Sequence, residues 1–221
     1  GSALVFELSK VETQHIREAV VGHLRHIDSD LAKRVAAGLG LEALPPAPPA
    51  AVKPIDMPPS PALQIIGKAK PTLQGRCVGI LVDDGSDAAM VHALRKAVQD
   101  AGAAVKIVAP KVGGAKLDDS RKLAADGQLA GTPSVVFDAV AVVLSAAAGK
   151  ALAKEAAAID WVRDAYGHLK AIAFDDGAEA LLQVGGVAKD AGVVKAANVS
   201  DFLKAAATRQ WDREPKLRTL A

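Results

Sequence analysis

The sequence lacks residues and patterns that several classes of protein require. It has one cysteine, Cys77, which excludes an internal disulfide and a CxxC metal site and makes the cytoplasm the expected compartment. No block of Lys or Arg is present to follow a phosphate backbone, so we expect no nucleic-acid partner. The longest uncharged apolar run, residues 139–149, is shorter than the roughly 20 residues that cross a bilayer, so we expect no membrane partner.

Aromatic residues are also scarce, at 3 % of the chain, although half of the residues are apolar. A core built mainly from Ala, Val, Leu and Ile suits slim helices packed closely on a sheet. The 221 residues are enough for one such core of about 100–150 residues with something added. Gly1 and Ser2 stand in place of an initiator Met and resemble a cloning remnant, so we expect a fragment of a longer protein.

The first part of the chain predicts two short helices. Apolar residues recur every three or four positions over 16–27, which indicates one face of an amphipathic helix. Ser9 and Glu12 fit a capping box at its start. A second helix is expected after Asp28 or Ser29.

A proline-rich linker follows these helices. Eight of the twelve prolines lie between Pro45 and Pro61, and such a segment favours an extended, semi-rigid spacer. The predicted division of the chain is a helical region over 1–42, a linker over 43–74, an α/β domain over 75–209 and a tail over 210–221.

Beyond the linker, short apolar runs alternate with helical patterns. This rhythm predicts an α/β fold with a doubly wound, mostly parallel sheet covered by helices on both faces. Asp126 and Gly127 are read as the turn of a hairpin, and Ser200 as the cap of the final helix. The predicted strands are 77–82, 105–109, 134–143, the apolar part of LKAIAF at 169–174, and 193–194.

Four aspartates follow predicted strands, at Asp83, Asp84, Asp175 and Asp176. Ligands of such sheets bind beyond the carboxyl ends of the strands, where these side chains are expected. Carboxylate oxygens there would suit Mg²⁺ or Ca²⁺. Capping of helix starts by Asp84, Ser86 and Asp176 is the alternative, and we predict no metal site.

Other candidate ligands have simpler interpretations. His23 and His26, with Asp30 nearby, form a weak metal-like cluster or lie on a solvated helix side. Cys77 begins a strand and reads as a buried thiol. The single tyrosine, Tyr166, reads as a core residue of a helix.

Three segments carry a family resemblance. RCVGILVDDGSD, ADGQLAGTPSVVFDAVAVV and KAIAFDDGAEALL resemble the flavodoxin-like C-terminal domain of large-subunit haem catalases. The stretch before the linker, LVFELSKVETQHIREAVVGHLRHIDSDLAKRVAAGLGL, looks like the closing helices of the catalase core in the same subfamily. The resemblance covers nearly the whole chain in the expected order.

The resemblance implies a parent enzyme that decomposes hydrogen peroxide, in the context of oxidative stress, at a haem held by an earlier part of the protein. It therefore implies no cofactor and no enzyme activity for this fragment. The implied partners are the catalase core of the same chain and further copies in a homo-oligomer. Stabilisation of that enzyme is the implied role, and unfolded client proteins are further partners if the fragment acts as a chaperone.

The domain is also similar to the class I glutamine amidotransferase superfamily, whose active members carry a Cys at a strand-to-helix elbow. That resemblance places Asp175 at the Cys position, followed by Asp176 and Gly177, with Asp83 or Asp84 near the assisting acid and Ser145 in an altered loop. These residues are read as a vestigial site with no catalytic residue. The alternatives are a residual amidase or deglycase-like hydrolase at Asp175 and a small-ligand sensor.

Overall fold

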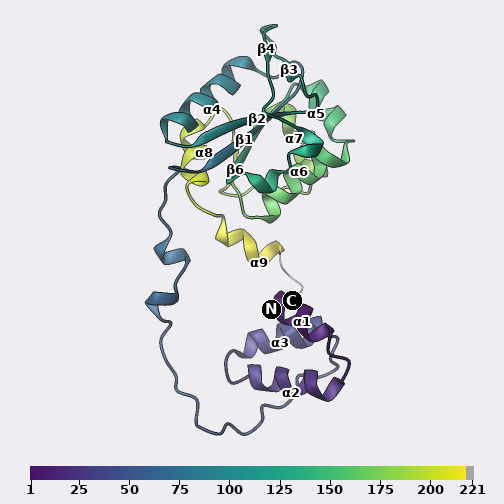
Figure 1. Ribbon diagram of the computed structural model, residues 1–221, viewed down its shortest axis with the longest axis vertical. Helices are drawn as coiled ribbons and strands as arrows, with labels where there is room; N and C mark the ends of the chain where they lie inside the picture. The colour runs from purple at the N-terminus through teal and green to yellow at the C-terminus, as the bar shows by residue number, and fades with distance from the viewer. Residues whose placement is uncertain (218–221) are drawn as a thin grey trace. The chain divides into compact units, whose positions relative to one another are not determined.

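The computed structural model describes residues 1–217 (Figure 1). Residues Ile65–Glu214 form one compact unit, and Gly1–Gln64 belong to another. The finer predicted boundaries, after residues 42, 74 and 209, stay predictions. Residues 218–221 of the predicted tail lie outside the described residues.

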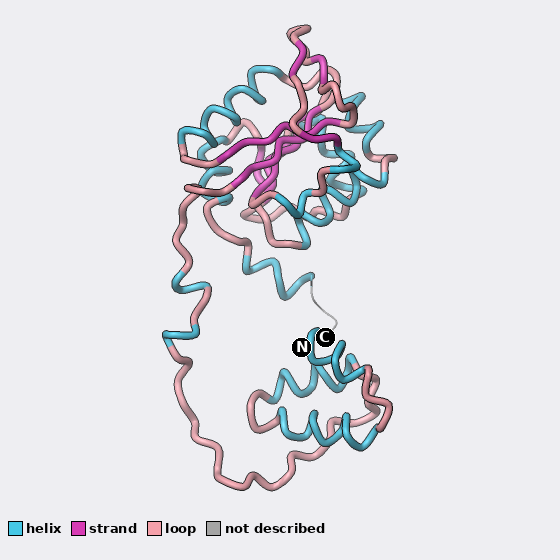
Figure 2. Tube along the Cα trace, viewed as in Figure 1, coloured by secondary structure: helices cyan, strands magenta, loops and turns pink. Residues whose placement is uncertain are grey.

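The larger unit contains a six-stranded sheet in which every neighbouring pair is parallel. Its order is β5-β2-β1-β6-β7-β8 (Figure 2). The chain therefore winds outwards in both directions from β1 and β6, as in flavodoxin-like folds, and the topological switch point lies between these two strands. The strands are β1 (Cys77–Val82), β2 (Ala104–Ala109), β5 (Gly127–Gln128), β6 (Ala139–Val143), β7 (Ile172–Phe174) and β8 (Val193–Lys195).

Helices cover both faces of the sheet, which confirms the predicted fold class (Figure 1). Alternate residues of a strand point to opposite faces, so Val140 and Val142 pack with one helix layer and Ala139, Ala141 and Val143 with the other. One layer contains α5 (Ala146–Leu152), α6 (Ala156–Gly167) and α7 (Glu179–Val184). The other contains α4 (Ala88–Asp100) and α8 (Val199–Ala206).

The hairpin prediction is wrong in its position. The hairpin is formed by β3 (Ala115–Lys116) and β4 (Lys122–Leu123). Asp126 instead lies directly before the edge strand β5, and its carboxylate accepts a hydrogen bond from the Ile107 amide at 2.8 Å. Asp126 and Gly127 therefore do not form a turn. The Asp126 carboxylate accepts from β2 in the place of a backbone carbonyl, and Gly127 pairs with β2 as part of β5.

The strand predicted over 134–143 is also too long. Ser134–Val136 form a 3-10 turn, and only Ala139–Val143 pair with neighbouring strands. Another 3-10 turn, Leu129–Gly131, precedes this segment. Because β6 lies between β1 and β7, its five residues are fully buried, which explains the continuous apolar run.

The N-terminal unit contains three α-helices, one more than predicted: α1 (Ser2–Ser9), α2 (Gln14–Leu24) and α3 (Ser29–Gly38). The capping box predicted at Ser9 and Glu12 is wrong, because the Ser9 hydroxyl donates to the Phe6 carbonyl inside α1. The predicted start of α3 is confirmed. The Asp28 carboxylate caps it by accepting from the Asp30 and Leu31 amides.

The linker is extended apart from two 3-10 turns, Pro61–Leu63 and Ile66–Lys68. The chain ends, among described residues, with the 3-10 turn Trp211–Arg213 and α9 (Glu214–Leu217). Over residues 1–217, no helix combines the length and apolar character needed to cross a bilayer.

Candidate functional site

The predicted elbow follows β7. Asp175 precedes a 3-10 turn, Asp176–Ala178, that leads into α7. Its carboxylate accepts two hydrogen bonds at 2.9 Å, one oxygen from the Ala178 amide and the other from the Leu144 amide. Asp175 therefore caps its own turn and ties it to the loop that follows β6.

The environment of Asp175 makes its carboxyl harder to ionise than a free aspartate. Burial raises the pKa of the Asp175 carboxyl above its usual value, while the hydrogen bonds from the Leu144 and Ala178 amides oppose that rise. A nucleophilic carboxylate needs a free oxygen directed at its substrate. Here backbone amides of the protein itself occupy both oxygens.

Backbone atoms also close the space around the elbow. A Cβ atom on Gly177 would lie 1.8 Å from the Leu144 carbonyl oxygen, and one on Gly149 would lie 1.9 Å from the Gly177 carbonyl oxygen. Only glycine fits both positions, because the β6–α5 loop, α5 and the elbow are in direct backbone contact. Backbone atoms therefore fill the space directly beside Gly177 and Gly149.

Ser145 is the N-cap of α5 and connects the loop after β6 to the loop after β1. Its hydroxyl donates to the Asp84 carbonyl at 3.1 Å and accepts from the Ala148 amide at 3.2 Å. Ser86, fully buried, lies within hydrogen-bonding distance of the Asp83 and Val143 carbonyls. These contacts hold the loops after β1 and β6 against each other.

The predicted capping roles of Asp84, Ser86 and Asp176 are wrong. Asp87 caps α4 by accepting from the Met90 amide. Asp84 instead binds Lys111 Nζ at 2.5 Å and the Lys116 amide at 2.9 Å, and these bonds lower the pKa of its carboxyl.

Asp176 is exposed and pairs with Lys195 Nζ at 2.5 Å. Asp83 accepts from the Asp84 amide at 2.8 Å, so its contacts are local. No interaction joins either Asp83 or Asp84 to Asp175 within residues 1–217. The structure thus places the four aspartates at one sheet edge without bringing them together.

Over the described part of the chain, no three His, Cys, Asp or Glu side chains are grouped as metal ligands. In the His23 and His26 pair, His26 Nε2 lies 2.7 Å from the Pro48 carbonyl oxygen. His26 thereby contacts the start of the linker. Cys77 is half-buried, and burial raises the pKa of its thiol.

The opposite edge of the sheet contains a polar cluster that sequence reasoning missed. Lys170, just before β7, is 2 % exposed and donates to the Ser134 carbonyl at 2.6 Å. Burial lowers the pKa of the Lys170 ammonium to about 8; Arg209 adds to this effect, while Asp138 and Asp164 oppose it. The Ser134 hydroxyl is buried without a hydrogen-bond partner among described residues.

Arg213 completes this cluster and is also 2 % exposed. Its guanidinium binds both carboxylate oxygens of Asp190, at 2.7 and 2.9 Å, and donates to the carbonyls of Tyr166 and Lys170, each at 3.0 Å. It also lies 4.1 Å from the centre of the Tyr166 ring. The only indication of this cluster in the sequence is that charged residues such as Lys170 stand next to apolar runs.

The surroundings of Tyr166 do not suit a haem ligand. It is the one tyrosine, it is 7 % exposed, and its ring packs in the core beneath Arg213. Burial raises the pKa of the Tyr166 phenol, which disfavours a metal-binding phenolate. The core assignment of Tyr166 is confirmed.

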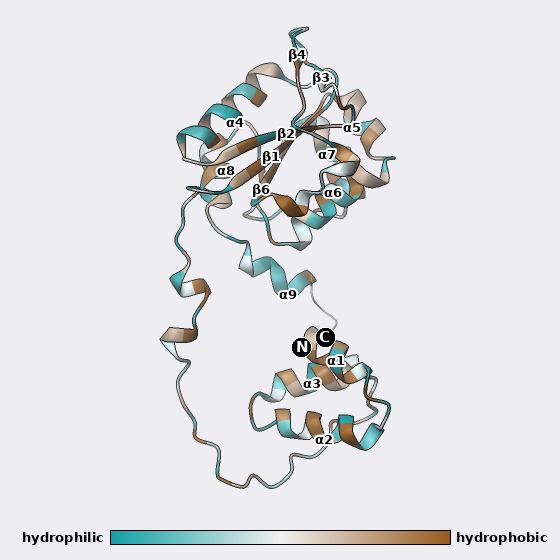
Figure 3. Cartoon of the chain, viewed as in Figure 1, coloured by the Kyte–Doolittle hydropathy of each residue, from teal (hydrophilic) through white to brown (hydrophobic). Residues whose placement is uncertain are grey.

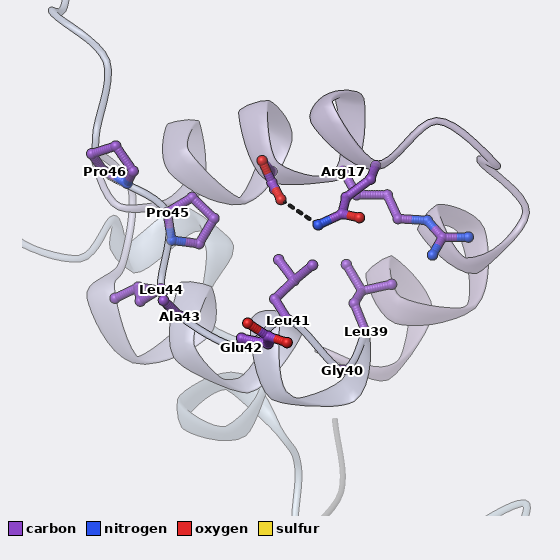
Figure 4. A pocket seen from close by; sticks show the side chains of 11 residues that line it. Arg17, Leu39, Gly40, Leu41, Glu42, Ala43, Leu44, Pro45 and Pro46 are labelled. Carbon is purple, nitrogen blue, oxygen red and sulfur yellow. Dashed lines mark hydrogen bonds between the residues drawn. The ribbon is translucent and has the colours of Figure 1, made fainter.

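The N-terminal unit has a groove of its own, of about 600 Å³. Figure 4 shows the side chains of Leu39 and Leu41 pointing into it, beneath polar residues of α2, where Gln14 donates to Glu18 at 2.7 Å. Its lining is Gln14, Arg17, Glu18 and residues 39–46. Apolar and charged groups thus share one open surface.

Comparison with known proteins assigns both parts of the chain. Residues 74–215 match a family described as "C-terminal domain found in long catalases", and residues 2–39 match one described as "Catalase-related immune-responsive". The chain is 44 % identical to Catalase C of Rhizobium meliloti over 99 % of its length, and 38 % identical to Catalase HPII of Pseudomonas aeruginosa over 96 %. It is 33 % identical to Catalase-2 of Bacillus subtilis, again over 96 %.

The matched regions make up 32 %, 30 % and 31 % of these three relatives, so the chain spans about a third of their length. The larger of the two family matches coincides with the α/β unit described above, including its elbow and both sheet edges. With that match covering most of the sequence, the chain belongs to the family of C-terminal domains found in long catalases.

Proposed function

We propose that this chain is the non-catalytic C-terminal region of a haem catalase that decomposes hydrogen peroxide, and that it stabilises the enzyme and its oligomer. The observation that supports a non-catalytic role is the closed elbow at Asp175. The two carboxylate oxygens of Asp175 accept hydrogen bonds from the Leu144 and Ala178 amides, and Gly177 lies against the Leu144 backbone. A site with this architecture holds loops together.

The same observation disfavours the hydrolase alternative. Nucleophilic catalysis by a carboxylate requires a free oxygen and a base within about 3 Å of the reacting group. His168 is the nearest histidine in sequence, and it caps the far end of α6, before β7. We therefore propose structural roles for these residues: Asp175 and Ser145 are caps. Asp83, Asp84 and Asp176 make local hydrogen bonds and ion pairs.

Heat inactivation of the full-length protein tests the stabilising role. A variant that lacks residues 75–217 should decompose peroxide at first but lose this activity faster on heating, and should dissociate more readily in gel filtration. Equal inactivation rates together with an unchanged oligomer would contradict the proposal.

The hydrolase alternative has its own assay. The chain and its Asp175→Asn variant are compared on methylglyoxal-modified substrates, and both should give the background rate. Turnover by the chain that the variant lacks would assign chemistry to Asp175.

A second candidate function, as a chaperone for unfolded proteins, is favoured by the surface of the linker. Its large apolar side chains are exposed, and Figure 3 shows the hydrophobic colour recurring along this extended segment. Exposed apolar side chains in succession suit transient binding of unfolded chains. The residues are Val52, Ile55, Met57, Leu63, Ile65 and Ile66, each at least 59 % exposed.

Light scattering from a heated client enzyme tests this function. The chain should suppress aggregation more than serum albumin does, and replacement of Ile55, Ile65 and Ile66 by Ser should weaken the suppression. Suppression no better than that by albumin would exclude the chaperone function.

A further inference from the structure

The carboxyl edge of the sheet has a hollow that is separate from the elbow. It lies where the β3–β4 hairpin meets the loop after β1, and its volume is about 470 Å³. Figure 1 shows β3 and β4 extending beyond the main sheet at this end. The lining residues are Asp84, Lys111, Gly113, Gly114, Ala115, Lys116, Ser120 and Lys122.

Glycine geometry brings the walls of this hollow together. Gly114 has φ +86°, and a Cβ atom there would lie 1.9 Å from the Leu123 carbonyl oxygen. The loop before β3 can therefore press against β4 only with glycine at this position. Lys122 Nζ lies 3.4 Å from the point at which Gly113 would carry a Cβ atom, so the ammonium group faces open backbone.

The charges in the hollow do not cancel. Three lysines and one aspartate line it, which leaves a formal charge of +2. The two oxygens of Asp84 are already used, by Lys111 Nζ and the Lys116 amide. Neighbouring Asp119 is likewise held, by Arg121 at 2.7 Å.

Three polar side-chain groups of the lining are available to hydrogen-bond a ligand. Among residues 1–217, neither ammonium group of Lys116 and Lys122 nor the hydroxyl of Ser120 makes a hydrogen bond or ion pair. They are two cationic donors and one neutral donor around an open space. Lysines bind phosphate oxygens as point charges, and a hydroxyl adds a directional hydrogen bond.

The place in the fold supports the same chemistry. In doubly wound sheets ligands bind beyond the carboxyl ends of the strands, and this hollow is formed by loops that follow β1 and β2. The elbow is closed by backbone, while the hollow is open. Its volume of about 470 Å³ leaves room for a ligand with two linked phosphates.

We propose that this hollow, formed by Lys111, Lys116, Ser120 and Lys122, binds a small polyphosphate anion of the pyrophosphate type. Lys116 and Lys122 neutralise the phosphate oxygens, and Ser120 donates to one of them. Asp84 keeps Lys111 in place and orders the hairpin.

Isothermal titration of the chain with inorganic pyrophosphate at physiological salt tests the proposal. We expect one saturable site. A Lys116→Gln/Lys122→Gln double variant should bind about tenfold more weakly, because two charged contacts to the phosphates are lost. A Lys204→Gln variant is the matched control, since it removes an exposed lysine from α8.

Circular dichroism spectra should show that the double variant keeps the fold of the chain. An adenosine diphosphate titration then separates two sources of the same chemistry: equal affinity indicates that the phosphates alone are bound, and tighter binding that a nucleotide is. Either result agrees with the proposal if the double variant weakens it. Absence of saturable binding, or equal binding by the folded double variant, would overturn it.

Discussion

The two edges of the central sheet bury charge in different ways. At the carboxyl edge, Asp175 is surrounded by backbone amides of its own turn and of the neighbouring loop. At the amino edge, Lys170 and Arg213 donate to carbonyls, and Arg213 pairs with Asp190. The first arrangement joins two turns, whereas the second anchors the end of the domain to the sheet.

This difference shows that a residue's position at the usual ligand-binding edge of a fold does not by itself make it reactive. The carboxyl edge is where doubly wound sheets normally bind ligands, yet its elbow is filled by Gly149 and Gly177. The most perturbed lysine lies instead at the amino edge, where its side chain is only 2 % exposed. A shifted pKa here follows from structural burial, so it does not indicate a reactive group.

The largest effect is expected from Arg213→Ala at the amino edge. The change leaves Asp190 without its partner and frees two carbonyls, so it should lower the free energy of unfolding by about 3–5 kcal/mol. Urea denaturation followed by circular dichroism measures it. Arg163→Ala is the control, because Arg163 makes an exposed pair with Asp160 worth roughly 0.5 kcal/mol; similar losses would refute the anchoring role.

Gly177→Ala should give the next largest effect, at the carboxyl edge. The new methyl group would meet the Leu144 carbonyl oxygen, and such overpacking costs about 3 kcal/mol when backbone must move. Gly167→Ala serves as the control, since nothing lies within 4 Å of its added Cβ atom. If both variants unfold at the same denaturant concentration, the elbow is not closed.

Alkaline titration distinguishes Lys170 from the rest of the molecule. Its pKa is about 8 in the folded state and about 10.4 when unfolded, so the unfolded chain binds more protons between these values. Stability should therefore rise with pH across this window, by on the order of 2 kcal/mol.

The Lys170→Met variant isolates that contribution from those of Cys77 and Tyr166, whose pKa values are raised by burial. The difference in unfolding free energy between the chain and the variant should change with pH from 8 to 10. A constant difference would mean that Lys170 titrates normally.

The smallest effect is expected from Asp175→Asn. The amide group keeps one acceptor but presents an NH₂ to the other backbone amide, so a loss of about 1–2 kcal/mol is expected. Asp176→Asn is the matched change one residue later, at a side chain 94 % exposed, and should be nearly neutral. Thermal melts that place Asp176→Asn below Asp175→Asn would reverse the assignment of the cap.

Sequence reasoning predicted the features that depend on neighbouring residues. The apolar runs at 77–82 and 105–109 form strands as expected, because burial on both faces requires continuous apolar side chains. The strand-to-helix elbow at Asp175 is also confirmed in position. The first helix was missed because Ser9, a good cap, bonds backwards to Phe6.

Features that join distant segments were not predictable. Ser134, Lys170, Asp190 and Arg213 are far apart in the sequence and are joined by the fold. The closure of the elbow depends on Gly149, which lies in another helix. Such contacts follow from three-dimensional packing, which residue spacing does not encode.

The double use of the Asp175 carboxylate has a kinetic consequence. Because one side chain accepts from Leu144 and from Ala178, displacement of the Asp175 side chain breaks both hydrogen bonds at once. The two amides should exchange with deuterium through a shared opening, with equal protection that falls together in Asp175→Asn. The cap formed by Asp175 thus makes the two turns one cooperative unit of local unfolding.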